Sequence, residues 1–513
     1  MNVAAPAAAP VAPRVLRLHA EDDVLIAVDR LEEGQLLEGN LRALRRIPRG
    51  HKAAAHAIAA GAPVRKFGQV IGVASADIAA GDWVHEHNLA MADFARDYAF
   101  GQDARPVAAA DVVETFEGFH RENGKVGTRN YIGILTSVNC SASVARFMAE
   151  AAKRDGLLER YPNIDGIIPL VHGGGCALDV GGEGYEVLKR TQWGYAANPN
   201  MAAVIMVGLG CEGFQIARFK ELYGIEENDR FRSMTIQEVG GTRKTVDQGL
   251  GVLREMAPLA NAVTRAPATA SKLALALQCG GSDGYSGITA NPALGAAADL
   301  LAAQGGAAVL GETPEIYGAE HLLTRRAVSR AVGEKLIERI RWWEDYTARN
   351  KMQMNNNPSP GNKLGGLTTI LEKSLGAAAK GGTTPLTAVW EYAEPITTGG
   401  FSFMDTPGYD PVSVTGQVAG GCTVIAFTTG RGSAYGCKPV PSIKLATNTP
   451  VYEKMTDDMD INCGDVLDGV SIADKGREIF DAVLRVASGE RSKSEQLGYG
   501  DAEFNPWIIG ATM

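Results

Sequence analysis

Six short, continuous apolar runs constrain this 513-residue chain more than any other feature, because each is followed at once by glycine and polar residues. Runs of this length and composition are typical of parallel strands that are buried on both faces. The amphipathic stretches 144–154 and 292–304 lie between such runs and predict helices. The sequence therefore predicts α/β layers with a parallel sheet and right-handed crossovers. The six runs cover residues 131–136, 166–171, 203–207, 273–277, 307–310 and 423–427.

The segments that follow these runs carry side chains that can bind ligands or react. In open α/β sheets, ligands bind beyond the carboxyl ends of the strands. Core filling does not explain so many charged and ligating groups at these positions, because charged residues are rarely buried. We therefore expect the functional site at this edge. The residues concerned include Asn139, Cys140, His172, Cys176, Cys211, Glu212, Cys279, Ser282, Asp283, Glu312 and Arg431.

The chain before these runs has a different pattern. From Val15 to Leu89, short apolar segments alternate with turns at glycines, which predicts a small β-rich domain. A weakly patterned stretch at 101–111 is typical of a linker. The predicted fold class is α/β, with the β-rich domain followed by two Rossmann-like parts. The expected bounds are 15–100 for the β-rich domain, 101–114 for the linker, 115–390 for a central α/β domain and 391–513 for a C-terminal α/β domain.

Charge and cysteine content exclude several classes of protein. The formal net charge is −9 without a long basic block, which argues against nucleic-acid binding. No apolar run approaches the roughly 18 residues of a membrane helix, and the proline-broken residues 1–14 do not resemble a signal peptide. Seven cysteines without C-x-x-C spacing argue against a disulfide framework. We expect a cytoplasmic protein with no nucleic-acid or membrane partner.

The segment His85-Glu86-His87-Asn88 stands near the end of the predicted β-rich domain. In a strand, residues i and i+2 point to the same side, so both imidazoles could bind one metal ion. The alternative is a pair of exposed histidines beside a turn.

Residues 208–213, Gly-Leu-Gly-Cys-Glu-Gly, match the G-x-G-x-x-G pattern of dinucleotide-binding proteins. Glu238 follows near the position of a ribose-binding acid, so an NAD-dependent oxidoreductase is one alternative. Cys211 and Glu212 stand in the middle of the turn, however. There they suit contact with a metal ion or a substrate better than contact with a pyrophosphate.

Four cysteines follow predicted strands and could converge on an iron–sulfur cluster. The alternative is that they are small buried side chains, the commonest situation for a free cysteine. A single thiolate or glutamate on one metal ion is a third possibility. The four are Cys140, Cys176, Cys211 and Cys279.

Cationic side chains near the predicted site suit an anionic substrate. Arg431 directly follows an apolar run and offers a planar fork for a carboxylate, and Arg129 is a similar candidate. The two prolines of the segment 357–363 restrict their neighbours, which helps to hold Asn362 and Lys363 in place. The alternative for this segment is an ordinary surface loop.

Several strings together resemble the altronate/galactarate dehydratase family of hexuronate and aldarate catabolism. The resemblance extends over nearly the whole chain, and the strings at 279–292 and 357–363 are very specific. It implies an N-terminal SAF-type domain that carries His85 and His87, followed by two α/β parts. It also implies a requirement for a divalent ion, Fe²⁺ or Mn²⁺. The strings are IPRGHKAA, AGDWVHEHN, GKVGTRNY, VGLGCE, CGGSDGYSGITANP, PEIYGAEHLL, NPSPGNK and FTTGRGSAYG.

The resemblance implies a hydro-lyase that converts a sugar acid such as altronate or galactarate into a 2-keto-3-deoxy acid. More distant members act on sulfolactate, from which sulfite leaves. One segment departs from the family, because His172-Gly-Gly-Gly-Cys176 stands where a His-Thr-Tyr-Gly-Cys type of string is expected. This departure leaves the identity of the substrate undecided, but it does not change the expected reaction class. A non-catalytic sugar-binding protein is the alternative from another class, and the number of reactive groups argues against it.

Dehydration of a 2,3-dihydroxy acid requires removal of the C2 proton and departure of the C3 hydroxyl group, and a divalent ion assists both steps. We expect His85 and His87 to bind the ion, with Cys211 or Glu212 completing its ligands. We expect His172 to transfer the proton, because imidazole titrates near neutral pH.

The substrate is expected to bind between domains, because His85 and His87 belong to the β-rich domain whereas the other expected site residues belong to the α/β parts. Arg431 and Lys363 are expected to hold its carboxylate. Glu212 and Lys363 are also catalytic candidates, and the chain is expected to form a homodimer. The further substrate contacts are expected from Ser282, Asp283, Asn139, Arg129 and Asn362.

Overall fold

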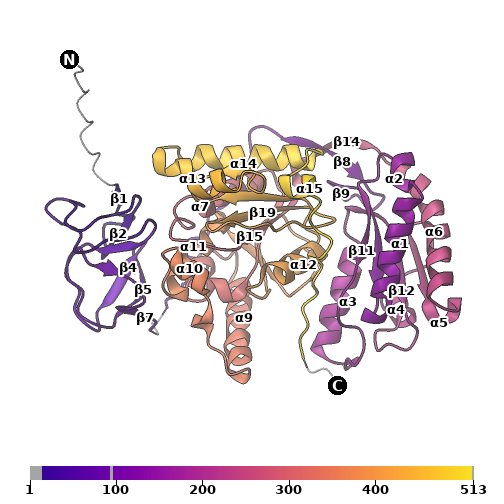
Figure 1. Ribbon diagram of the computed structural model, residues 1–513, viewed down its shortest axis with the longest axis horizontal. Helices are drawn as coiled ribbons and strands as arrows, with labels where there is room; N and C mark the ends of the chain where they lie inside the picture. Colours follow the sequence, from indigo (N-terminus) through magenta and orange to yellow (C-terminus); the bar gives the residue numbers. More distant parts are fainter. Residues whose placement is uncertain (1–13, 93–95, 511–513) are drawn as a thin grey trace, which may run out of the picture.

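The computed structural model describes residues 14–92 and 96–510, and it consists of three parts arranged in a row (Figure 1). A β-rich N-terminal domain and an α/β domain with a four-stranded sheet lie on opposite sides of an α/β domain with a seven-stranded sheet. The predicted α/β class with a β-rich start is confirmed. The proline-rich residues 1–13 lie outside the described residues.

The N-terminal domain is built from two small antiparallel sheets that pack around one apolar core. Its strands are short because glycines at 50, 61 and 81 adopt positive φ and turn the chain. The first sheet has the order β1 (Val15–Leu16), β2 (Val24–Ala27), β3 (Lys52–Ala54) and β6 (Trp83–Val84). The second has the order β4 (Pro63–Lys66), β5 (Gln69–Ala74) and β7 (Leu89–Ala90).

The four-stranded sheet is fully parallel and is covered by helices on both faces, which explains its continuous apolar strands. On one face, Ile132 and Ile205 pack with Met148 and Leu253 of α1 and α6. The other face packs against α3 and α4. The strand order is β11 (Gly166–Leu170), β10 (Tyr131–Thr136), β12 (Met201–Gly208) and β13 (Phe231–Thr235). The helices are α1 (Ala142–Arg154), α3 (Glu183–Ala196), α4 (Ile216–Tyr223) and α6 (Thr242–Ala262).

The seven-stranded sheet is also parallel, with α7 and α14 on one face and α12 on the other. Its strands β17 and β18 pair with each other across residue 390, where the sequence predicted a domain boundary. That boundary is therefore corrected, since the chain passes from one sheet to the next before residue 274. The order is β17 (Leu386–Trp390), β18 (Gly400–Met404), β16 (Ala307–Leu310), β15 (Ala274–Cys279), β19 (Val424–Thr429), β20 (Ser442–Ala446) and β21 (Ile461–Asn462). The helices are α7 (Ala290–Ala303), α12 (Asp410–Gly420) and α14 (Ile472–Ala487).

A small three-stranded sheet joins the two α/β domains at the top of Figure 1. It contains β14 (Arg265–Thr269), β8 (Thr115–His120) and β9 (Val126–Gly127). The remaining helices are α2 (Leu157–Arg160), α5 (Ile236–Val239), α8 (Glu320–Thr324), α9 (Arg330–Arg349), α10 (Pro360–Leu364), α11 (Ile370–Ala378), α13 (Thr449–Lys454) and α15 (Lys493–Gln496). In the described ranges, no helix has the length and apolar character needed to cross a membrane.

The N-terminal domain docks on α11 through buried apolar and charged contacts. Leu375 of α11 belongs to the same apolar cluster as the N-terminal strands. Beside it, Lys52 and Lys66 donate to Glu372 at 2.8 and 2.9 Å, and all three side chains are buried. The Glu372 carboxylate offsets part of the positive charge of the two ammonium groups, which makes their burial tolerable.

The six strand ends that the sequence placed at one edge fall into two groups. Strands β10, β11 and β12 end in the four-stranded domain, whereas β15, β16 and β19 end in the seven-stranded domain. Two separate edges therefore carry reactive side chains.

Candidate functional site

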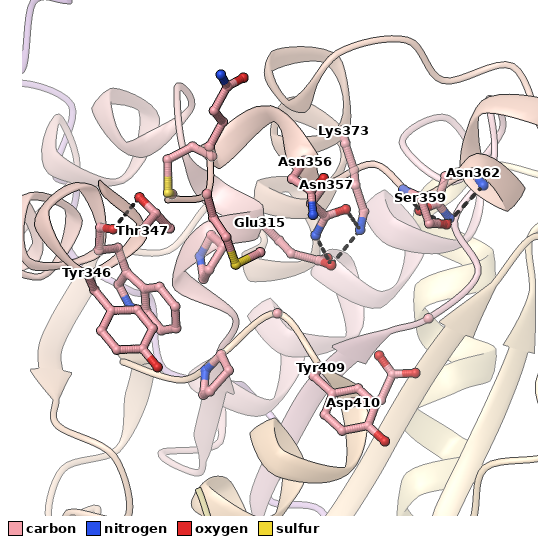
Figure 2. A pocket seen from close by; sticks show the side chains of 18 of the residues that line it. Glu315, Tyr346, Thr347, Asn356, Asn357, Ser359, Asn362, Lys373, Tyr409 and Asp410 are labelled. Atoms are coloured by element: carbon pink, nitrogen blue, oxygen red, sulfur yellow. Dashed lines mark hydrogen bonds and ion pairs between the residues drawn. The ribbon is translucent and has the colours of Figure 1, made fainter. Parts of the chain in front are cut away.

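A cavity of about 760 Å³ lies at the carboxyl edge of the seven-stranded sheet (Figure 2). Its wall combines the end of β15, the segment after β16, the end of α9, the loop 350–362, α11 and the start of α12. The side chains that face it are mostly polar. They include Glu315, Thr347, Asn357, Ser359, Lys373, Tyr409 and Asp410.

A hydrogen-bonded group of three side chains stands in the wall of this cavity (Figure 2). Lys373 Nζ contacts Glu315 Oε1 at 2.5 Å and donates to Asn357 Oδ1 at 2.8 Å. Asn357 Nδ2 donates to the same Glu315 oxygen at 3.0 Å. This arrangement holds a lysine ammonium and a carboxylate in fixed positions beside a space that a ligand can enter.

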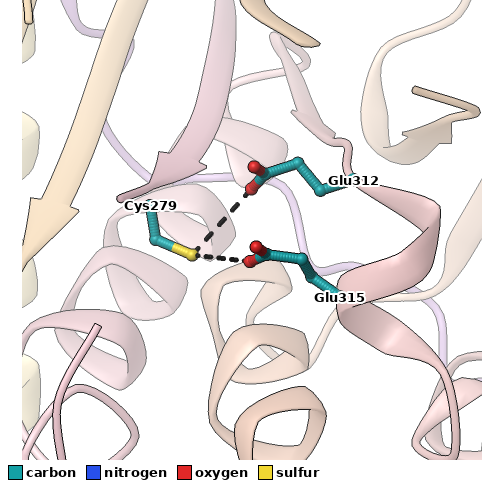
Figure 3. Close-up of side chains that lie close together, drawn as sticks. All are labelled: Cys279, Glu312 and Glu315. Carbon is teal, nitrogen blue, oxygen red and sulfur yellow. Dashed lines mark hydrogen bonds between the residues drawn. The ribbon is translucent and has the colours of Figure 1, made fainter. Parts of the chain in front are cut away.

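A thiol and a second carboxylate lie close to Glu315 (Figure 3). Cys279 Sγ is 3.3 Å from Glu315 Oε2 and 3.9 Å from Glu312 Oε2. Lys380 Nζ lies 2.7 Å from the same sulfur and 3.5 Å from Glu312 Oε2. Glu312 Oε1 is buried and has no hydrogen-bond partner among the described residues. The cluster thus joins two carboxylates, one thiol and two ammonium groups.

The surroundings push the proton affinities of these carboxyl groups apart. Burial and the charge of Glu315 raise the pKa of Glu312 well above its ordinary value. Burial acts in the same direction on Glu315, but the Lys373 and Lys380 charges outweigh it and lower the pKa of that group. Burial and the Glu315 charge also raise the pKa of Asp410 to about 7. A pair of carboxyl groups with separated pKa values is typical of acid–base chemistry.

Cys279, Glu312 and Glu315 form a group that could hold a metal ion. They offer ligand atoms that lie within 4.8 Å of one another, and all three residues are buried. A thiolate with two carboxylates suits a first-row transition metal, and the unpartnered Glu312 oxygen is a ready acceptor for a cation. Lys380 already supplies one positive charge to the cluster, so a divalent ion competes with that ammonium.

Aromatic side chains form another part of the wall. Trp343 and Trp507 are stacked with ring centroids 5.4 Å apart, and Tyr346 packs against both. Trp343 Nε1 donates to Asp405 at 2.7 Å, which fixes the ring. Such faces pack well against the C–H groups of a carbon chain.

Four of the predicted site residues lie at or beside this cavity. The Asp283 carboxylate accepts hydrogen bonds from Ser286, Thr447 and Asn448, and burial raises its pKa, so it braces the turn. Asn362 forms the capping box of α10 with the N-cap residue Ser359, and it donates to the backbone carbonyl of Ser282 at 2.9 Å. Arg431 is exposed, and its backbone N–H donates to Gly281, a residue that lines the cavity. Of the four residues, Asp283, Asn362 and Ser282 are buried, and Arg431 is exposed and cationic.

The predicted histidine pair is not on a strand. Residues 85–88 form a turn between β6 and β7, with the N–H of His85 bonded to Asn88 Oδ1. His85 stacks on Trp83 and His87 lies on the exposed surface, so the expected i, i+2 geometry is corrected. Burial lowers the pKa of His85 to about 4, and its Nδ1 has no partner among the described residues.

Lys363 lies near this turn and joins two domains. Its Nζ donates to Glu86 Oε1 at 2.5 Å, linking α10 to the N-terminal domain. The side chain is thereby engaged in an interdomain ion pair beside the histidines.

The predicted ligands Cys211 and Glu212 lie in the four-stranded domain, on the far side of the molecule from the histidines (Figure 1). One ion therefore cannot take ligands from both places within one chain. Glu212 accepts hydrogen bonds from Ser137 Oγ at 2.5 Å, from the N–H of Gly210 at 2.6 Å and from that of Leu209 at 3.2 Å. The glutamate thus occupies the N–H groups that a dinucleotide pyrophosphate would need.

His172 and Asn139 belong to the same domain. His172 Nε2 lies 2.8 Å from the Thr136 carbonyl, and its Nδ1 accepts from the N–H of Gly174 at 3.2 Å. Burial lowers its pKa to about 4. Asn139 donates to the His172 carbonyl at 3.3 Å. Both ring nitrogens of His172 are therefore engaged in holding a loop.

Arg129 is fully committed to structural contacts. It donates to Glu495 at 2.6 and 2.8 Å and to the carbonyls of Thr128, Val486 and Glu490, and it is 2% exposed. These bonds tie the four-stranded domain to α14 and α15.

Sequence reasoning did not single out Glu315, Lys373, Lys380 or Asp410. The signal for Glu315 was present in the string PEIYGAEHLL, and Glu312 lies two residues after the apolar run 307–310. The lysines lie on α11 and just after it, and no local pattern marks them.

Models of three known domains match the chain. The altronate/galactarate dehydratase SAF domain covers residues 13–92, and the second domain of D-galactarate dehydratase/altronate hydrolase covers 118–261. The C-terminal domain of D-galactarate/altronate dehydratase covers 270–512. The chain belongs to the altronate/galactarate dehydratase family. It is an enzyme of the carbon–oxygen lyase type, a hydro-lyase.

Curated relatives of the family match over nearly their full length. Altronate dehydratase of Bacillus subtilis is 35% identical over 94% of this chain and 96% of its own. Galactarate dehydratase (L-threo-forming) of Escherichia coli is 37% identical over 96% of both chains. The beta subunit of (2R)-sulfolactate sulfo-lyase of Chromohalobacter salexigens is 32% identical over 75% of this chain and 95% of its own.

Proposed function

We propose that this altronate/galactarate dehydratase family member removes water from a sugar acid in the cavity of about 760 Å³ at the edge of the seven-stranded sheet. The observation that supports this location most strongly is the fixed Lys373–Glu315–Asn357 group beside Asp410, whose pKa is raised to about 7. The cavity has room for a six-carbon acid, and its wall mixes polar groups with an aromatic face.

Asp410 is the residue that we assign to proton transfer. In its ionised form it takes the proton from C2, and the protonated carboxyl then gives a proton to the departing C3 hydroxyl, so that water leaves. The enol that remains tautomerises to the 2-keto-3-deoxy acid. A carboxyl group with a pKa near neutrality can act in both directions at physiological pH.

Lys373 and Arg431 are the cations that we assign to the substrate. Loss of the C2 proton places extra negative charge on the substrate carboxylate, and an ammonium held at a fixed position stabilises that charge. Arg431 has an exposed side chain, and its backbone N–H bonds to Gly281 of the cavity wall, so we assign its guanidinium to the ground-state carboxylate.

A divalent ion, Fe²⁺ or Mn²⁺, is the cofactor that we propose. When bound, it acts as a Lewis acid on the substrate carboxylate or leaving hydroxyl. Cys279, Glu312 and Glu315 would hold it, and they would do so with Lys380 moved away from the thiol.

The names of two relatives support altronate and galactarate as candidate substrates. The sulfo-lyase relative supports a second candidate reaction, in which sulfite leaves from sulfolactate by the same elimination. We also expect a homodimer, which light scattering on the purified chain can test.

A substrate panel tests the proposed function. Metal-stripped protein is incubated with altronate, galactarate, glucarate and sulfolactate, with and without Fe²⁺ or Mn²⁺ in the absence of oxygen. We expect metal-dependent formation of a 2-keto-3-deoxy acid from one sugar acid. Release of sulfite would instead identify the alternative reaction. No product from any of the four compounds, with metal bound, would contradict the proposed function.

A further inference from the structure

Three cysteines outside the proposed reaction site gather at the carboxyl edge of the four-stranded sheet. Cys140, Cys176 and Cys211 follow β10, β11 and β12, three parallel strands that are neighbours in the sheet. Adjacent strands are about 4.8 Å apart, so the loops that leave them start close together.

Backbone hydrogen bonds tie the three loops to one another. The N–H of Asn139 donates to the Gly174 carbonyl at 3.0 Å, and the N–H of Phe214 donates to the Gly175 carbonyl at 3.0 Å. The loop of Cys176 is thus bonded on both sides, one or two residues from its own cysteine. Gly175 has φ +98°, and a Cβ there would lie 2.0 Å from the Ser137 carbonyl oxygen. This close approach is possible for glycine alone.

The three thiols differ from the other cysteines of the chain. Cys140, Cys176 and Cys211 are exposed, and none of their sulfur atoms has a hydrogen-bond partner in the described part of the chain. The other four cysteines are buried. The three exposed thiols are therefore accessible from solvent to iron and sulfide.

The acidic and imidazole groups of this edge are already engaged. Glu212 accepts three hydrogen bonds from its own turn and Ser137, and both nitrogens of His172 are bonded. The free donors at the edge are thus sulfur atoms, and thiolate ligands select zinc, Cu(I) or iron–sulfur clusters.

The distance between the sulfur atoms distinguishes a zinc ion from an iron–sulfur cluster. Four-coordinate zinc with Zn–S bonds of about 2.3 Å requires sulfur atoms roughly 3.8 Å apart. Among residues 14–92 and 96–510, the group of three metal-ligating side chains whose ligand atoms lie within 4.8 Å of one another is Cys279, Glu312 and Glu315. The three exposed sulfur atoms are therefore not all within 4.8 Å of one another. A cluster accepts wider spacing, because each thiolate binds a different iron atom.

We propose that Cys140, Cys176 and Cys211 bind a four-iron, four-sulfide cluster. Three protein thiolates on such a cluster leave one iron without a protein ligand, so that this iron can bind an oxygen atom of another molecule. The loop after Cys176 continues into residues 178–185, which line a cavity of about 560 Å³. That cavity shares Tyr346 and Asn350 with the candidate reaction cavity. A role of the cluster in dehydration rests on the proposed function, whereas cluster binding does not.

Anaerobic reconstitution of the full chain tests the proposal. The protein receives equal amounts of Fe²⁺ and Fe³⁺ with sulfide, which balances the charge of a cluster with two ferric and two ferrous ions without a further oxidant. We expect about four iron and four acid-labile sulfide per chain, with visible sulfide-to-iron absorbance. Cys140→Ser, Cys176→Ser and Cys211→Ser should each lower bound sulfide at least tenfold.

Cys422→Ala is the matched control, because Cys422 is buried in the apolar core of the molecule. It should retain sulfide at the level of the unaltered chain, with circular dichroism showing that every variant is folded. Absence of labile sulfide in the reconstituted chain, or zinc bound in its place, would overturn the proposal. So would folded cysteine variants that hold as much sulfide as the unaltered chain.

The outcome is separable from that of the substrate panel. A chain that holds the cluster but forms no keto acid contradicts the proposed function alone. A chain that forms keto acid without labile sulfide contradicts the cluster alone.

Discussion

At the scale of single residues, the site depends on where charge is compensated. Three of the charged residues predicted for the site are buried, namely Asp283, Glu212 and Arg129. The side chain of each is engaged in hydrogen bonds with neighbouring residues and is therefore not available to bind a substrate. Asp410 and Arg431 have fewer committed contacts and stand at the cavity or beside it. We therefore expect the charged side chains with few hydrogen-bond partners to contact the substrate, and the buried, fully bonded ones to hold the structure.

The rate of keto-acid formation should depend on the protonation of Asp410. Because burial and the Glu315 charge raise the pKa of Asp410 to about 7, the ionised form appears as pH rises through 7. We expect the rate to rise over the same interval. Glu315→Gln removes the neighbouring charge, so the midpoint of this rise should move to lower pH whatever the rate itself does. A pH–rate profile with an unchanged midpoint in Glu315→Gln would exclude Asp410 from this role.

Substrate affinity should depend on Arg431. Arg431→Met removes an exposed guanidinium from the residue that follows the cavity-lining turn, and we expect KM for the sugar acid to rise at least tenfold with a smaller change in kcat. Arg431→Lys keeps the charge without the planar fork and should recover part of the affinity. Steady-state kinetics would refute the assignment if Arg431→Met had the KM of the unaltered chain.

At the scale of elements, the sequence could predict the strands but not their partition. Continuous apolar runs such as 131–136 and 273–277 became buried parallel strands, because both faces of each sheet are covered. Nothing local says that the first belongs to a four-stranded sheet and the second to a seven-stranded one, since pairing is a long-range property. The sequence also did not predict the turn at 85–88 or the contact of Cys279 with Lys380, which lies 101 residues later. These features too depend on long-range contacts.

The docking of the N-terminal domain on α11 should depend on Glu372. Glu372→Gln leaves Lys52 and Lys66 buried without their counter-charge, and we expect it to cost about 3–5 kcal/mol of unfolding free energy. Glu38→Gln is the control, because Glu38 pairs with Arg17 at the surface, and it should cost less than about 1 kcal/mol. Denaturant unfolding at neutral pH measures both.

Acid provides a second check on Glu372. Burial opposes ionisation, but the Lys52 and Lys66 charges lower the pKa of Glu372 in the folded chain. Its contribution is therefore fully present above the ordinary glutamate pKa and is lost as pH falls toward the folded value. The difference in unfolding free energy between the unaltered chain and Glu372→Gln should shrink in acid. A difference of under 1 kcal/mol at neutral pH would show that the ion group is unimportant for docking.

At the scale of the whole molecule, two α/β domains each present a reactive edge, and the N-terminal domain covers one side of the seven-stranded part (Figure 1). The expectation of a single site that combines His85 with Cys211 is not met within one chain, because the seven-stranded domain separates them. The proposed reaction cavity instead shares Tyr346 and Asn350 with a second cavity, which is lined by residues of the loop that follows Cys176.

The measurement that tests the central claim most directly is the initial rate of keto-acid formation by matched variants. Asp410→Asn and Lys373→Met alter the wall of the proposed reaction cavity, and His87→Ala alters the exposed turn of the N-terminal domain. With the sugar acid that the panel identifies, we predict that the two cavity variants lose at least about 100-fold in kcat while remaining folded. His87→Ala should keep a rate within about threefold of the unaltered chain. Near-normal rates in both cavity variants, or a loss confined to His87→Ala, would contradict a reaction at the edge of the seven-stranded sheet.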